Sequence, residues 1–239
     1  SVGGGLLTAP AFLGSEDTYL LAVPDVRLKY RDLFFASVSQ GAGFNFINRG
    51  GWRAGPLLKY AFARNEDGET PFRIGGDETR ALRGLGDVDG TIEAGGFLEY
   101  TWRKALSGKV EVRQGIGGHE GLRADLNGQY RAVSGNLLYG FGPRLSLASH
   151  EYTQSYFGVD ALQSARSGLR PYKTEGGLLS YGFGGFAMLP LSQAMSLNLF
   201  AGLDRLGGDA GDSPLVQERG ARNQASAGIS FTYRFGFMP

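Results

Sequence analysis

The chain has no cysteine, only two histidines and no long apolar run. The lack of cysteine fits a protein that crosses an oxidising periplasm without unpaired thiols. Without a run of about 18 apolar residues the chain cannot cross a membrane as a helix, so a membrane role would have to come from β-strands. It also begins at Ser1 without a methionine or an apolar leader, so we expect that any signal peptide has been removed.

Glycine, in contrast, is abundant, with 40 of 239 residues against a usual level near 7%. The glycines occur singly or in pairs within alternating segments, with no collagen-like triplet repeat. Because glycine weakens a strand, this usage indicates tight curvature, bulges or close backbone approach, all of which a closed barrel requires.

Side-chain character alternates along many segments with a period of two. From residue 223 to 237 the odd positions are mostly apolar or aromatic, and the even positions are polar, glycine or charged. Residues 88–102 and 122–132 show the same two faces. Since successive strand residues point to opposite faces, each segment has one apolar face and one polar face.

The two faces fit either a soluble sandwich or an outer-membrane barrel. In a barrel the apolar face contacts lipid and the polar face lines the lumen. Several strands carry an aromatic residue near a short turn, which is typical of the girdle at a membrane interface and favours the barrel. The residues predicted to face lipid or form the girdle are Tyr30, Trp52, Tyr60, Tyr100, Trp102, Tyr130, Phe231, Tyr233 and Phe235.

The opposite face of the same strands carries a predicted charge network. Its members are Arg27, Lys29, Arg53, Lys59, Asp89, Glu93, Glu99, Lys109, Glu111, Arg113, Arg123, Asp125, Arg131, Arg144 and Arg234. The simpler interpretation is that these charges pair across neighbouring strands and brace the wall. A selective channel would instead need an excess of one sign, and the near balance argues against strong selectivity.

Connection lengths predict the orientation. Short turns and longer polar loops broadly alternate, and outer-membrane barrels keep short turns in the periplasm and long loops outside. We predict an all-β fold: one closed antiparallel transmembrane β-barrel domain over residues 1–239, with about twelve strands and ten as the alternative. Residues 33–47 form either one strand or two. The expected strands are 2–11, 20–30, 33–39, 42–47, 52–64, 87–102, 105–116, 121–132, 136–149, 173–190, 195–206 and 222–237.

The residues give little support for catalysis. His119 lies in a tight turn and His150 at a strand end next to Ser149, where adjacent strand residues would face apart, so we expect two exposed rim histidines. We predict no enzyme activity, no cofactor, no metal and no nucleic-acid partner. The long segment 152–172 contains a predicted helix at 160–166 and either plugs the lumen or stands outward as a contact surface.

Seven stretches in order along the chain carry a family resemblance. They include APAFLGSED (9–17), GLGDVDGTIEAGGFLEY (84–100) and YFGVDALQSARSGLRPY (156–172). The chain resembles the MipA/OmpV family of Gram-negative outer-membrane proteins, the MltA-interacting protein group. One departure is the end, where Met238 and Pro239 follow the aromatic Phe237 and are either native or a cloning remnant.

The resemblance implies an outer-membrane location and a scaffold that links a lytic transglycosylase to a penicillin-binding protein. The alternatives are a narrow pore for small solutes and a barrel involved in adhesion or antibiotic response. Expected partners are outer-membrane lipid, lipopolysaccharide and periplasmic murein enzymes, while the oligomeric state stays open.

Overall fold

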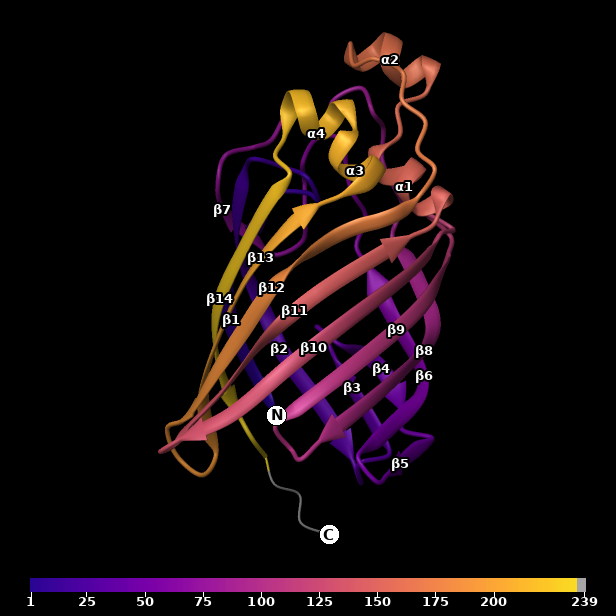
Figure 1. Ribbon diagram of the computed structural model, residues 1–239. Helices are drawn as coiled ribbons and strands as arrows, with labels where there is room; N and C mark the ends of the chain where they lie inside the picture. The colour runs from indigo at the N-terminus through magenta and orange to yellow at the C-terminus, as the bar shows by residue number, and fades with distance from the viewer. Residues whose placement is uncertain (236–239) are drawn as a thin grey trace.

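The computed structural model describes residues 1–235 and shows a closed barrel wall with helices at one end (Figure 1). Twelve antiparallel strands form the wall, and β1 closes the ring by pairing with both β14 and β2. The predicted twelve-strand barrel is therefore confirmed. The wall strands are β1 (Val2–Pro10), β2 (Thr18–Tyr30), β3 (Phe34–Ser37), β4 (Gly41–Phe44), β6 (Trp52–Ala61), β8 (Thr91–Trp102), β9 (Leu106–Ile116), β10 (Leu122–Ser134), β11 (Leu137–Ala148), β12 (Gly177–Pro190), β13 (Met195–Leu206) and β14 (Asn223–Tyr233).

Residues 33–47 contain two strands, β3 and β4, which form a hairpin of four residues on each side. Two further short strands lie outside the ring path. β5 (Ile47–Arg49) pairs with the start of β6, and β7 (Arg73–Gly75) pairs with the loop-end part of β2. The wall is therefore shorter at this hairpin than elsewhere. The long 62–90 connection joins β6 to β8.

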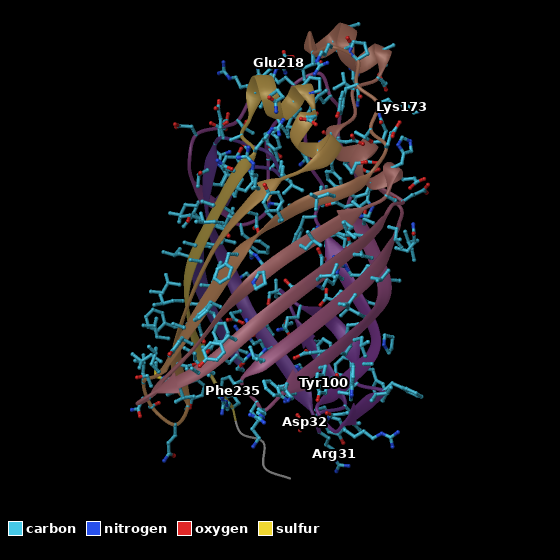
Figure 2. All side chains as sticks on the ribbon, viewed as in Figure 1. Arg31, Asp32, Tyr100, Lys173, Glu218 and Phe235 are labelled. Carbon is cyan, nitrogen blue, oxygen red and sulfur yellow. The ribbon has the colours of Figure 1, made fainter. Side chains whose placement is uncertain are left out.

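Tight turns join the strands at one end of the barrel. Arg31 and Asp32 between β2 and β3 have φ of 46° and 55°, and Arg103 and Lys104 between β8 and β9 have φ of 48° and 60°. Two successive residues with positive φ are the signature of the hairpin turn whose twist matches that of the strands. Figure 2 shows Arg31, Asp32 and Tyr100 at this end, which we call the turn end.

The opposite end, the loop end, carries four helices and the apolar core of the molecule (Figure 1). The helices are α1 (His150–Phe157), α2 (Ala161–Ser167), α3 (Gly208–Asp212) and α4 (Pro214–Arg219). One buried cluster joins Phe157 of α1 to Leu206 and Val216, and a second joins Leu82, Leu169 and Leu215. The hydrophobic core therefore lies among the loops, while the lumen beneath it is polar. None of the helices within residues 1–235 is long and apolar enough to cross a membrane.

Several predicted strand ends were wrong. β8 begins at Thr91 rather than at 87, so Asp89 precedes the strand and is exposed instead of belonging to the wall. β14 ends at Tyr233, so Arg234 and Phe235 lie beyond it, both exposed. In both places the apolar–polar alternation of the sequence continues beyond the last residue of the paired strand. The alternation alone therefore cannot show where strand pairing stops. The predictions for Phe237, Met238 and Pro239 lie outside the described residues.

Candidate functional site

The barrel encloses a cavity of about 860 Å³, bounded by inward-facing side chains. Basic residues outnumber acidic ones in its lining, which differs from the near balance expected from the sequence. The basic members are Arg27, Lys29, Arg53, Lys59, Lys109, Arg123, Arg131 and Arg144, and the acidic members are Glu99, Glu111, Asp125 and Asp204.

A contiguous ion-pair network runs along the inner face of the wall from β6 to β10. Glu111 accepts hydrogen bonds from Lys59 at 2.6 Å and Arg113 at 2.7 Å, and it also pairs with Lys109. Arg113 further donates to Glu93 at 2.8 Å and to Asp125 at 2.6 Å. The register places these residues on neighbouring inward positions, so each charge meets an opposite one across the ladder. This arrangement suits bracing of the wall.

Among the other predicted lumen charges, Arg123 joins this network through Asp125, and the others form separate pairs. Arg53 donates to Glu99 at 2.7 Å, and Arg144 donates to Asp204 at 2.5 Å. Arg123 pairs with Asp125 at 3.1 Å, while Arg27 and Lys29 pair with Asp25 and Asp32 near the turn end. Arg131 differs from these, because it donates to Gln129 at 2.6 Å and has no ion pair among residues 1–235. Arg234 lines a smaller cavity of about 290 Å³ at the turn end.

The outward faces are apolar and exposed. All nine predicted lipid-facing and girdle residues have exposed side chains. Tyr30 and Tyr60 are the most exposed of them, at 58% each. At the turn end the rings of Trp52 and Tyr100 lie 4.5 Å apart, and those of Tyr233 and Phe235 lie 4.8 Å apart. A second aromatic group lies toward the loop end, where Tyr60 and Phe72 each pack edge-on against Phe62. Sequence reasoning missed Phe72 because it belongs to the long 62–90 connection and not to a strand.

Helix α1 closes the loop end over the lumen. Tyr152 is buried, and its hydroxyl oxygen accepts a hydrogen bond from Arg123 at 3.3 Å. Phe157 is fully buried against the loop core. α2 shows the opposite arrangement, because it has no buried residue and extends outward at the tip of the molecule in Figure 1. The segment 152–172 therefore combines an inward cap with an outward helix.

The prediction of two exposed histidines was wrong for His119. Its side chain is fully buried against Tyr152, with Nε2 3.3 Å from Glu93 Oε1 and Nδ1 accepting from the Gly121 N–H at 3.1 Å. His150 is half-buried, and its Nδ1 lies 2.6 Å from the Thr174 carbonyl oxygen. These contacts give both histidines structural partners, and Ser149 Oγ accepts from the Leu122 N–H instead of facing His150.

Burial also shifts the ionisation of groups in this cap. Arg64, in the connection after β6, donates to the Tyr156 carbonyl oxygen at 2.6 Å, and burial lowers its pKa to about 10. Burial raises the pKa of the Tyr152 hydroxyl, and burial together with the neighbouring Tyr152 raises that of Tyr156. Both phenols therefore stay protonated, as packing of their rings in the cap requires.

Sequence reasoning also missed two aromatic residues that face the cavity, Phe186 and Phe200. Phe186 lies on the glycine-rich β12 and Phe200 on β13, and apolar residues occupy both faces of these strands, so the alternation there is weak.

The chain is similar to two solved structures and to one protein family. A NanC porin structure has a TM-score of 0.55 at 8% sequence identity, with 98% of this chain and 100% of that chain covered, so it shares the fold. A bacterial polysaccharide outer membrane secretin has a TM-score of 0.48 at 11% identity, with 98% of each chain covered. No curated protein matches the chain significantly. The family model described as MltA-interacting protein MipA matches residues 2–235, nearly the whole chain, and the protein therefore belongs to the MipA family.

Proposed function

We propose that this outer-membrane barrel is a non-enzymatic scaffold that holds murein-remodelling enzymes at its turn end. The family description supports one such partner, because MipA proteins are named for an interaction with MltA. By the resemblance drawn from the sequence, the enzymes are a lytic transglycosylase and a penicillin-binding protein. Lipid contact is proposed for the exposed apolar band that includes Leu98, Leu126 and Phe231.

The closed loop end is the observation that carries this proposal. α1, α3 and α4 pack together over the wall, and Phe157, Leu206 and Leu215 are each at most 1% exposed. A transport pore would need an open path through this end, whereas a scaffold needs only a stable wall and an accessible surface. Short turns favour a periplasmic position for the turn end, where murein enzymes work.

The loop end then faces outward, where lipopolysaccharide is the proposed neighbour. The 62–90 connection exposes acidic side chains, among them Asp67, Glu69, Asp77 and Glu78. Carboxylates of this kind suit the divalent cations that lie between lipopolysaccharide phosphates.

Site-specific crosslinking in intact cells tests the scaffold proposal. A photo-crosslinking residue is placed at Asn48 or Arg103 in the short turns, and a matched one at Leu162, which is exposed on α2. We expect capture of a murein enzyme from the turn positions and none from Leu162. Capture of no murein enzyme from any turn position, or equal capture from Leu162, would contradict the proposal.

A narrow pore is the second candidate, and the basic excess around the lumen favours small anions as its solutes. This reading requires the loop cap to open. Conductance in a planar bilayer separates the two candidates, because a scaffold with a closed cap conducts no steady current.

A further inference from the structure

Two phenylalanine rings lie in the lumen on β12 and β13, beginning two strands along the wall from the β10 end of the ion-pair network. Phe186 of β12 and Phe200 of β13 are paired neighbours in the ladder. A Cβ atom on Gly140 would lie 2.6 Å from the ring of Phe186, and one on Gly228 would meet the ring of Phe200, so each ring rests on a glycine of the next strand. Phe200 nevertheless remains 41% exposed to the cavity. One part of the Phe200 ring thus packs on the wall, and the part that remains exposed to the lumen is available for contact with a ligand.

Two arginines flank these rings. Arg131 of β10 pairs in register with Gly140, which in turn pairs with Phe186, so Arg131 occupies the same row of the sheet as both rings. Arg144 of β11 lies closer to the loop end, and its guanidinium crosses the backbone at Gly184, about 3.1 Å from where a Cβ would stand. The row between the arginine and the rings is glycine on three neighbouring strands, at Gly142, Gly184 and Gly202, and the Arg144 guanidinium lies across Gly184 and Gly202 toward the rings.

Both guanidinium groups keep unused donors. Arg144 Nη2 bonds Asp204, while its Nε is buried and has no hydrogen-bond partner within residues 1–235. Arg131 uses Nε for Gln129 Oε1 and forms no ion pair in the described part of the chain. Because a guanidinium carries five N–H donors in a planar fork, Arg144 Nη1 and the Nη atoms of Arg131 can still donate to a carboxylate oxygen, whereas the buried Nε of Arg144 is out of reach.

We propose that Phe186, Phe200, Arg131 and Arg144 form a binding site for a carboxylate carried on a ring. The carboxylate bonds the two guanidinium groups, and the ring lies against the phenylalanines beside the Arg144 guanidinium. The surrounding cavity of about 860 Å³ is within the usual range for small-molecule sites, and its basic excess attracts an anion. The ligand enters from the turn end, since packed loops close the other. The site does not depend on the scaffold function.

Isothermal titration calorimetry on the full-length protein refolded in detergent tests this site. The probes are benzoate, an aromatic acid, and glucuronate, a sugar acid, with benzamide and glucose as their neutral counterparts. We expect at least one acid to bind about tenfold or more tightly than its neutral counterpart, because charge-assisted bonds to arginine are lost in the neutral molecule. The acid that binds identifies the ring chemistry.

Three variants locate the binding. Arg131→Gln is expected to weaken the acid about tenfold or more, and Phe200→Leu, which keeps an apolar side chain but removes the flat ring, about threefold or more. Arg53→Gln is the control, because it removes the same charge from the lumen at a residue that pairs with Glu99, away from the two rings. The affinity of this variant for the acid should stay within about twofold of the native value. Folding of each variant is verified by the heat-modifiable gel shift.

The proposal is overturned if no acid binds, if neutral and charged probes bind equally, or if Arg53→Gln weakens binding as much as Arg131→Gln. The last result would show a diffuse attraction of anions to the lumen instead of a site.

Discussion

Arg113 shows how a charge is accommodated inside the wall. Its side chain is 3% exposed, and it contacts three carboxylates on two neighbouring strands and its own. Burial of one arginine is costly, but the carboxylates are equally buried and depend on it for compensation. Arg53 uses the same chemistry with one partner, Glu99, and its side chain remains 41% exposed.

Replacing these two arginines should therefore have unequal effects. Arg113→Met leaves Glu93, Glu111 and Asp125 short of a partner, and we expect a loss of about 3–5 kcal/mol in the free energy of unfolding. Arg53→Met should cost less, because only one carboxylate, Glu99, loses its partner and the lost arginine is itself 41% exposed. Urea unfolding of the two variants in lipid vesicles measures the difference, and equal losses would mean that the network does not brace the wall.

At the same scale, alternation predicted the side of the sheet correctly for residues within long strands, such as Glu99 and Leu98. It failed for Asp89, because a two-residue period persists beyond the end of hydrogen bonding. It also gave no sign of the site around Phe200. There the lumen face contains glycines that are covered by side chains from neighbouring strands. The residues next to them in the sequence do not reveal those contacts.

Strand β10 is the clearest single element for testing the two faces. Leu126 points outward and is 37% exposed, whereas its neighbour Asn127 lines the cavity. Leu126→Arg would place a charge in hydrocarbon at a cost of about 2–4 kcal/mol, while Asn127→Arg remains in the polar lumen. We expect much poorer assembly of the first variant in the heat-modifiable gel shift. Equal assembly of both would show that the faces are assigned the wrong way round.

The loop helices differ in how far their sequences specify them. The helix predicted at 160–166 is confirmed as α2, where Asp160 and Gln163 form a capping box and Gly168 ends the helix at a φ of 79°. These are local signals that a sequence displays directly. α1 has no side-chain cap at Ser149, and its residues are held by distant partners such as His119 and Leu206. Its position therefore could not be predicted from the sequence.

Phe157 should be the residue that fixes the cap. Phe157→Ala removes a fully buried ring from the loop core, and such changes cost about 3–5 kcal/mol. We expect faster proteolysis within 149–176 while the barrel wall stays intact on the gel. Leu162→Ala on α2, where the side chain is 65% exposed, serves as the control and should be cleaved at the native rate. Unchanged cleavage of Phe157→Ala would contradict a cap held by this core.

At the scale of the whole molecule, the barrel is a cylinder with one sealed end. The wall is closed by the pairing of β1 with β14, the first residues of β1 and the last residues of β14 lie at the turn end, and the apolar core packs over the loop end. The ring closure was predictable, because strands that cross a membrane must leave no unpaired edge. The seal was not, since it consists of contacts among four connections that are far apart in sequence.

Single-channel recording in planar bilayers tests this sealed barrel most directly. The native protein should insert and give no steady conductance, because α1 and the loop core block the lumen. A variant in which 150–174 is replaced by a short glycine–serine linker should give steps of reproducible size, which would show that the barrel was inserted and that the cap was the barrier. Steady channels of reproducible size from the native protein would contradict the account and favour a transport function.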